Sequence, residues 1–320
     1  MLSGEKILVT GVTGQIAFPI AKTLAAENEV WGLARYSRPD DRQRVIDVGI
    51  VPVTCDLGNG EFDGVPDDFT YVVHLAASLA PGWDYDAAIR ANAEGTGLLL
   101  QHCRSAKGAL VMSTHSVYRP QDDPMYVFTE QSPLGECNST HTPTYSMSKI
   151  SQEATARFAA RAFGIPVTIA RMNASYGPNG GLPAMHVDAI ADGRPITTRW
   201  DPCMYSPIYE DDINTQVGAL LEAASTPALI VNWGGDEPVS VQEWAAYAGE
   251  LMGVEPVVDV APIEGSCADP SRTPRCVPPS PGRARWIGVR ASVAPSPLAI
   301  RTSSSRPPAR EHPFVEHHCL

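Results

Sequence analysis

The sequence predicts an α/β fold, namely a Rossmann-type doubly wound parallel sheet with a smaller C-terminal substrate-binding portion. Two observations support this prediction. Short apolar runs alternate with helical patterns from the first residues onward, the order that produces parallel strands joined by helices. A glycine-rich turn also stands between the first apolar run and the first helical pattern, as in dinucleotide-binding units.

Composition and charge limit the possible functions. The 320 residues carry a net charge of −12, and such an acidic protein is a poor binder of nucleic acid. No apolar run approaches the ~20 residues that a membrane-spanning helix needs, and the first residues show no signal-peptide layout. We therefore expect a cytoplasmic protein that is not bound to a membrane. The seven cysteines lack C-x-x-C spacing, so we expect neither a disulfide framework nor a metal site.

The first strand and turn have the spacing of a dinucleotide-binding site. An apolar run at 6–10 leads into G-x-x-G-x-x-A, and a helical pattern follows from residue 18. Glycines permit a tight turn and let a pyrophosphate approach backbone N–H groups at the start of a helix. The residues that we expect to contact a cofactor here are Gly11, Thr13, Gly14, Gln15 and Ile16, with Ala17 completing the pattern.

The end of the second strand indicates which dinucleotide binds. Proteins that bind NAD usually place an acidic residue there for the ribose hydroxyls, and an arginine suits a 2′-phosphate. Ala34 holds the acidic position, with Arg35 and Arg38 close by. This pattern favours NADP(H). NAD(H) stays possible, because Asp40 and Asp41 follow within reach of the ribose, and the arginines could be plain surface charge.

Further strands are predicted at 50–55, 70–75 and 109–113, with a long helix over 85–103 that contains Asn92. In a parallel sheet the carboxyl ends of the strands share one edge, where ligands bind. Residues that close or directly follow the third and fourth strands should therefore face the cofactor. They are Asp56, Leu57, Leu75, Ala76 and Ala77.

A tyrosine and a lysine four residues apart predict a proton-transfer device. Pro143 and the helix-forming run after it predict a helix that begins near Tyr145, which places Tyr145 and Lys149 on one face. A nearby ammonium favours the phenolate and would lower the phenol pKa from about 10 toward the working range. Taken alone, the pair also fits a half-buried tyrosine beside a solvated lysine. Thr114 ends the fifth strand, where its hydroxyl could hold a substrate oxygen, although such residues also mark strand ends.

Five motifs in order resemble one enzyme family. TGVTGQIA, HLAA at 74–77, STHSVY at 113–118, YSMSK at 145–149 and RMNASYGP at 171–178 are similar to those of the extended short-chain dehydrogenase/reductases, the NAD-dependent epimerase/dehydratase family. The resemblance covers about residues 5–262. It implies that Thr114 is the catalytic hydroxyl and Tyr145 the general acid/base. It also implies that Lys149 binds the nicotinamide ribose and lowers the tyrosine pKa, that Asn173 contacts substrate, and that a homodimer is possible.

Departures from the family pattern bear on the substrate. Dehydratases of the family carry Asp-Glu after the catalytic threonine, whereas this chain has His115 and Ser116, which disfavours sugar dehydration. We give His115 no catalytic role, since a histidine near a cleft is usually a hydrogen-bonded neighbour. Nucleotide-sugar enzymes commonly place an arginine before the segment at 205–213. Residues 202–204 contain none, although Arg199 is near, which favours a smaller or less charged alcohol or ketone.

The sequence divides into three parts. Residues 1–178, with a return segment at about 205–235, form the NAD(P)-binding domain, and 179–268 form the substrate-binding portion. Helices are predicted at 182–191 and 240–252 and a strand at 228–233, while the acidic run 210–212 is interpreted as a capping or solvated cluster. Residues 269–320 are rich in Pro, Arg and Ser and cannot form a core. We favour an altered reading frame for this tail over a flexible regulatory or membrane-adhering segment.

Three functions fit these observations. The leading hypothesis is an NAD(P)-dependent oxidoreductase that passes a hydride between nicotinamide and a carbonyl or alcohol of a small molecule, with Thr114, Tyr145 and Lys149 as the catalytic set. The first alternative is a nucleotide-sugar epimerase with retained NAD. The second is a non-catalytic NADP(H)-binding sensor, which the presence of the complete catalytic set disfavours.

Overall fold

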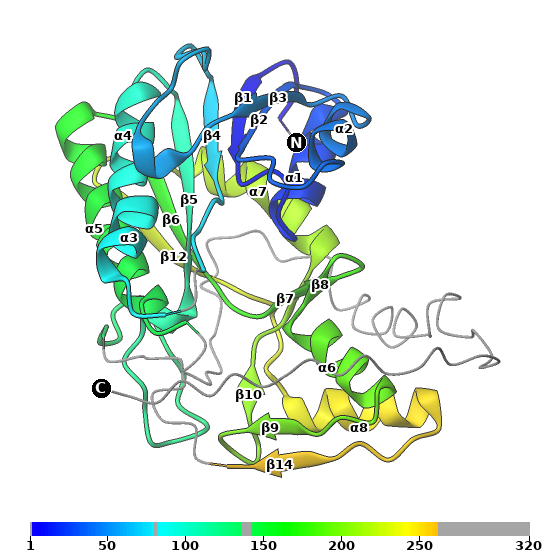
Figure 1. Cartoon of the computed structure of the whole chain (residues 1–320). Coiled ribbons are helices and arrows are strands. Elements are labelled where there is room, and N and C mark those ends of the chain that lie inside the picture. The colour runs from blue at the N-terminus through cyan, green and yellow to red at the C-terminus, as the bar shows by residue number, and fades with distance from the viewer. Residues whose placement is uncertain (1, 80–81, 136–141, 262–320) are drawn as a thin grey trace, which may run out of the picture.

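A computed structural model of the chain describes residues 2–79, 82–135 and 142–261, and its centre is a parallel seven-stranded sheet (Figure 1). The strand order is β12-β6-β5-β4-β1-β2-β3. The order reverses between β1 and β4, and the carboxyl edge at this switch point is where doubly wound sheets bind ligands. The strands are β1 (Lys6–Thr10), β2 (Glu29–Ala34), β3 (Val51–Thr54), β4 (Tyr71–His74), β5 (Gly108–Thr114), β6 (Val167–Met172) and β12 (Leu229–Trp233). This confirms the predicted fold class.

Helices cover both faces of the sheet, each on its own apolar core. On one face α1 (Ala17–Ala25), α2 (Asp41–Ile46) and α7 (Glu210–Glu222) pack through side chains that include Ile20, Val45 and Val217. On the other face lie α4 (Gly95–His102) and α5 (Tyr145–Phe163), which pack through Leu99 and Ala156 (Figure 1). Within the described ranges, no helix is both long and apolar enough to cross a membrane.

The helix expected over 85–103 differs from the prediction. It consists of α3 (Tyr85–Ile89), a π-helical turn η2 (Arg90–Glu94) and α4. The wider turn carries the buried Asn92, whose Oδ1 accepts from Ser78 N at 2.6 Å and whose Nδ2 donates to Ser148 Oγ at 2.9 Å. These contacts with the β4 loop and with α5 are the physical reason for the irregular turn, and π-turns of this kind recur at functional sites.

A smaller lobe lies beyond the carboxyl edge of the sheet. It contains α6 (Leu182–Ala191) and α8 (Val241–Met252), packed on a third apolar cluster that includes Ile190 and Trp244. The expected helix at 182–191 is present, and Ser240 caps α8 in a capping box with Glu243. The short strands of the lobe and its junction are β7 (Ser175–Gly177), β8 (Gly180–Gly181), β9 (Ile196–Thr198), β10 (Met204–Tyr205), β11 (Ile208–Tyr209), β13 (Val239–Ser240) and β14 (Val258–Val260).

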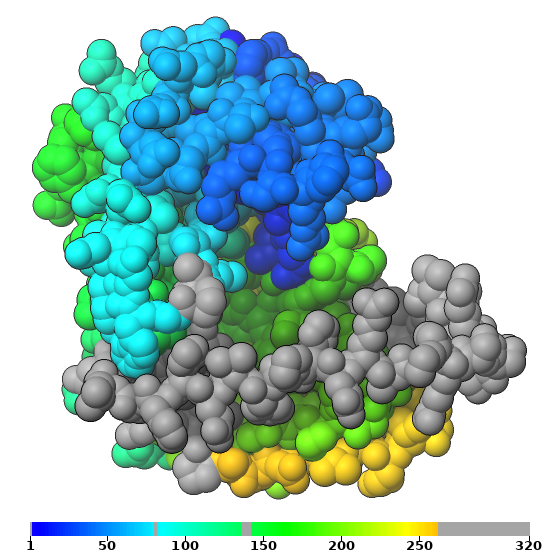
Figure 2. Space-filling model, in the orientation of Figure 1, coloured from blue at the N-terminus to red at the C-terminus, as the bar shows by residue number. Residues whose placement is uncertain are grey.

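The lobe meets the N-terminal part of the sheet domain. In the space-filling view, dark-blue residues of the N-terminal segment lie directly above green residues of the lobe (Figure 2). At this junction a Cβ built on Gly180 would lie 3.9 Å from Cγ of Gln15, which belongs to the glycine turn. The expected tail at 269–320 lies outside the described residues.

Candidate active site

The glycine turn is packed directly against the end of β4. Gly11 has φ +69° and donates to the carbonyl of Leu33 at 2.8 Å, while Gly14 N donates to Gly11 O at 2.8 Å. A Cβ on Gly11 would lie 2.8 Å from Cα of Ala76 and 2.9 Å from its N, so only glycine fits. The turn leads directly into α1, whose first residue Ala17 is buried. The structure therefore brings two of the predicted cofactor segments into contact beside the start of a helix, where backbone N–H groups can receive a phosphate.

A buried hydrogen-bond network around His74 stabilises the end of β4 next to the glycine turn. Oγ1 of Thr10 accepts from the backbone N–H groups of Leu75 and Ala76 at 3.1 Å each, so its hydroxyl donates to Nδ1 of His74 at 2.7 Å. His74 consequently carries its own proton on Nε2, which lies 2.7 Å from Thr96 Oγ1. Burial lowers the pKa of His74 to about 3, with a smaller contribution from Lys149. His74 is therefore neutral and ties β1, β4 and α4 together.

Thr114 and Tyr145 meet at the carboxyl edge. Thr114 is the last residue of β5 and Tyr145 the first of α5, and their side chains are hydrogen-bonded. The Thr114 Oγ1 also accepts from Ser116 N at 3.2 Å, which fixes its position. Burial raises the pKa of Tyr145 to about 12, and the bond to Thr114 opposes this rise.

Lys149 lies one helical turn after Tyr145 and is fully buried. Its Nζ donates to the backbone carbonyl of Met112 at 2.7 Å. Burial lowers the pKa of Lys149 to about 7, and the carboxylate of Glu153 opposes this fall. The lowered phenol pKa predicted from the pair is not found, because burial of the phenol dominates and the ammonium is directed toward Met112. The solvated lysine of the alternative interpretation is wrong, since Lys149 is 1% exposed.

Asn173 and His115 form a second polar pair at this edge. Oδ1 of Asn173 accepts from Ala174 N at 2.7 Å and from Ser206 N at 3.1 Å, and its Nδ2 lies 3.2 Å from Nδ1 of His115. Because Oδ1 accepts hydrogen bonds from two backbone N–H groups, the amide group that faces His115 is Nδ2, which donates to His115. Burial lowers the pKa of His115 to about 3, with a contribution from Arg171, so His115 is a neutral neighbour.

The region after β2 carries the predicted arginines on the surface. Arg35 and Arg38 are exposed, and their side chains make no hydrogen bond or ion pair with the described residues. Arg44 of α2 was missed by the sequence analysis. Its Nη2 donates to the carbonyl of Thr13 at 3.0 Å, and its guanidinium lies 4.1 Å from the centre of the Phe18 ring.

The remaining predicted cofactor residues surround the same edge. Leu57 and Leu75 are buried, whereas Gln15, Asp56 and Ala77 are exposed. The Asp56 carboxylate accepts from Gly58 N at 3.0 Å and caps the short helix η1 (Leu57–Asn59). The acidic run at 210–212 forms the first turn of α7. Among the residues that the structure describes, no three His, Cys, Asp or Glu side chains are grouped to hold a metal ion.

Comparison with known proteins gives consistent results. The sequence model of the NAD dependent epimerase/dehydratase family matches residues 7–199. A probable UDP-glucuronate 4-epimerase of Rhizobium meliloti is 25% identical over 301 residues, which cover 81% of this chain and 86% of that protein.

Two solved structures have the same fold. The UDP-glucuronic acid 4-epimerase of Bacillus cereus, solved with UDP-glucuronic acid and NAD, has a TM-score of 0.70 at 21% identity and covers 83% of this chain and 90% of its own. The UDP-N-acetylglucosamine 4-epimerase of Methanobrevibacter ruminantium has a TM-score of 0.74 at 15% identity, with coverages of 92% and 97%.

Proposed function

Because the chain belongs to the NAD dependent epimerase/dehydratase family, whose members are NAD-dependent enzymes, we propose that Thr114, Tyr145 and Lys149 are its catalytic residues. The bound dinucleotide would supply or accept a hydride at the carbon of a carbonyl or alcohol. The observation that carries this proposal is that Thr114, the last residue of β5, and Tyr145, the first residue of α5, interact through their side chains at the carboxyl edge.

Each residue of the set has a distinct role in the proposal. Tyr145, with its pKa raised to about 12, is protonated at neutral pH and donates its proton to the substrate oxygen during reduction. In the oxidising direction the phenolate must accept a proton, and the bond from Thr114 favours that form. Thr114 orients the substrate oxygen, and Asn173, which by resemblance to the family would contact substrate, lies at the same edge beside His115.

We propose that the cofactor lies along the switch point of the sheet. The glycine turn at Gly11, packed against Ala76, would bind the pyrophosphate there, and Lys149 would bind the nicotinamide ribose. The remaining contacts come from the residues predicted from sequence, namely Thr13, Gly14, Gln15, Ile16, Asp56, Leu57, Leu75 and Ala77. The predicted substrate-binding portion at 179–268, of which the structure describes residues 179–261, would bind the substrate.

NADP(H) is the cofactor that we propose. Ala34 offers no carboxylate to ribose hydroxyls, and the exposed side chains of Arg35 and Arg38 stand at the end of β2. A guanidinium binds a phosphate through two parallel hydrogen bonds, which suits a 2′-phosphate.

A second candidate is epimerisation of a nucleotide sugar on retained NAD. It is favoured by the similarity to a probable UDP-glucuronate 4-epimerase over most of both chains. The same three residues would serve both reactions, because epimerisation oxidises and then reduces one carbon. The two candidates differ in whether external cofactor is consumed.

One experiment separates the candidates. The purified protein is denatured, the released nucleotide is identified by mass spectrometry, and empty sites are titrated with NADPH and NADH. Stoichiometric NAD in the released fraction favours the epimerase, and an empty site that prefers NADPH favours the exchanging oxidoreductase. Carbonyl compounds, alcohols and UDP-sugars are then screened for turnover.

The catalytic assignment has its own control. Tyr145→Phe should lower turnover by about 10²–10⁴-fold while cofactor still binds. Tyr71→Phe removes a phenol hydroxyl at the opposite end of β4 and should leave turnover unchanged. Unchanged turnover in Tyr145→Phe would contradict the assignment, and cofactor binding without turnover on any substrate would support a sensor.

We also propose a homodimer through α4 and α5. Leu98, Met147 and Phe158 on these helices are 39%, 49% and 64% exposed, and a second copy of the chain would cover these apolar side chains. Phe158→Glu should shift the mass in solution to that of a monomer. Met185→Glu, at a similarly exposed position of α6 (63%), should not.

A further inference from the structure

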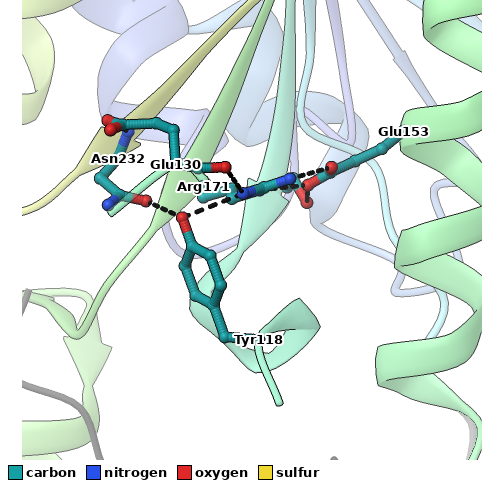
Figure 3. Close-up of polar contacts among 6 residues, drawn as sticks. Tyr118, Glu130, Glu153, Arg171 and Asn232 are labelled. Carbon is teal, nitrogen blue, oxygen red and sulfur yellow. Dashed lines mark hydrogen bonds and ion pairs between the residues drawn. The ribbon is translucent and has the colours of Figure 1, made fainter. Parts of the chain in front are cut away.

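A buried ion pair joins the helix of Tyr145 and Lys149 to the sheet. Nε and Nη2 of Arg171 on β6 donate to the two carboxylate oxygens of Glu153 on α5, at 2.9 and 2.7 Å (Figure 3). The side chains are 2% and 4% exposed. Two charges so far from water are costly to bury, and their pairing must offset that cost.

Both members of the pair are fixed from several directions. Ser113 Oγ donates to Glu153 Oε1 at 2.6 Å, so this oxygen accepts two hydrogen bonds. Nη1 of Arg171 donates to the phenol oxygen of Tyr118 at 3.0 Å and to the carbonyl of Glu130 at 3.1 Å. Figure 3 shows the guanidinium between Tyr118 and Glu153. The carboxylate therefore cannot turn away from its position.

That position is one helical turn beyond Lys149. Residues 145, 149 and 153 are spaced i, i+4 and i+8, which puts their side chains on one face of α5. Glu153 is 3% exposed and Lys149 is 1% exposed, so their interaction is weakly screened by solvent.

Among the residues that the structure describes, the other titratable groups near Lys149 do not supply negative charge. His74 on β4 and His115 in η3 (His115–Val117) are held neutral by burial. Arg171 is a cation, and Tyr145 is protonated because burial raises its pKa. The carboxylate of Glu153 is the group that raises the pKa of Lys149 against the effect of burial.

We propose that Glu153 is a positioning residue for Lys149: its carboxylate, locked by Arg171 and Ser113, favours the charged form of the lysine at the end of β5. The catalytic meaning of this inference rests on the proposed function, whereas the coupling between the two side chains does not. A pair of apolar side chains at 153 and 171 would often be as stable as the ion pair. Stability alone therefore does not account for the charges.

The coupling is measured directly on Lys149. Protein labelled with ¹³C at the lysine ε carbon is titrated by NMR, and the Lys149 resonance is assigned by its loss in Lys149→Arg. We expect a midpoint near 7 in the wild type. In Glu153→Gln it should fall by about one pH unit or more. Asp192→Asn removes a carboxylate from an exposed pair with Arg194 and should leave the midpoint unchanged.

A second variant deals with loss of folding. Glu153→Gln leaves a buried guanidinium without its carboxylate, which can unfold the protein. The double variant Glu153→Gln with Arg171→Met removes both charges and should fold, as judged by circular dichroism. Its Lys149 midpoint should be lower than that of Arg171→Met, which keeps the carboxylate. A folded Glu153→Gln variant with the wild-type midpoint, or a double variant with the midpoint of Arg171→Met, would overturn the proposal, because it would show that the carboxylate acts only on structure.

The outcome also separates this inference from the proposed function. A lowered midpoint without turnover on any substrate would retain the coupling and contradict the function. Turnover that depends on Tyr145, with an unshifted midpoint, would retain the function and contradict the coupling. If both hold, the pH profile of turnover in Glu153→Gln should shift in the same direction as the Lys149 midpoint.

Discussion

Lys149 of α5 donates a hydrogen bond of 2.7 Å to the backbone carbonyl of Met112 in β5. This hydrogen bond is the middle one of three contacts that join α5 to the end of β5. Tyr145 is bonded to Thr114 one turn earlier, and Glu153 accepts from Ser113 one turn later. Three successive turns of the helix are thus fixed on the last three residues of one strand. The relative position of Thr114 and Tyr145 consequently depends on buried contacts of both neighbours, and not on the two side chains alone.

Replacing Thr114 should test this arrangement. Thr114→Val keeps the shape of the side chain but loses the hydroxyl bonded to Tyr145, and we expect kcat to fall by about 10²–10³-fold. Thr114→Ser should retain most activity. Thr155→Val makes the same change on α5, where the hydroxyl donates to Ser151 O at 3.0 Å, and serves as the control. Equal activity of the valine and serine variants at 114 would contradict the assignment.

Two glycines with positive φ, one before β1 and one in the glycine turn, offer a matched pair of variants. Gly4 and Gly11 have φ values of +72° and +69°, so alanine is strained at both. Nothing lies within 4 Å of a Cβ at Gly4, whereas at Gly11 the backbone of Ala76 lies 2.8 Å away. Gly4→Ala should therefore cost about 1 kcal/mol of unfolding free energy without affecting cofactor affinity.

Gly11→Ala should lose more stability and also weaken cofactor binding by tenfold or more, at about 1.4 kcal/mol per tenfold change. Urea unfolding and a fluorescence titration with NADPH measure the two effects. Equal losses in both variants would mean that the close approach to Ala76 has no function of its own.

Local patterns in the sequence were sufficient for most of the fold. The start of α5 at Tyr145, the glycine turn and the capped helix at 241–252 follow from spacing and capping residues that lie close together in the chain. The carboxyl-edge location of Thr114 also followed, because a strand end fixes its own position in a parallel sheet.

Contacts between distant residues could not be predicted in this way. Asn92 bonds to Ser148, 56 residues later, and this contact accompanies the π-turn that interrupts the expected helix. Nothing in the local sequence pairs Arg171 with Glu153 or Arg44 with the carbonyl of Thr13. The direction of the Tyr145 pKa was missed for the same reason, because burial depends on the packing of the whole edge.

The arginines after β2 should set cofactor preference. If they bind a 2′-phosphate, Arg35→Ala should raise the Kd for NADPH by about tenfold or more, the loss expected for hydrogen bonds to a charged group. The Kd for NADH should stay nearly constant, because NADH lacks that phosphate. Arg104→Ala makes the same charge change just after α4 and controls for net charge. Equal losses for NADPH and NADH would contradict NADP(H) selectivity.

Two buried histidines should make the fold sensitive to acid. The pKa values of His74 and His115 are lowered by burial to about 3, whereas a histidine in the unfolded chain titrates near 6.5. Above pH 6.5 both states are neutral at these positions and stability is unaffected. Between pH 6.5 and 3 the unfolded state binds protons that the folded state does not, so stability falls as pH falls.

The contribution of His115 to the pH dependence of the unfolding free energy can be measured separately. Each histidine should lower the folding equilibrium constant by about tenfold per pH unit below 6.5. His115→Phe removes one titrating group, so its urea-derived stability should change less steeply from pH 6 to pH 4 than that of the wild type. Val117→Ala creates a cavity beside the same segment and should lower stability at every pH without altering the slope. An unchanged slope in His115→Phe would show that His115 takes up its proton in the folded state.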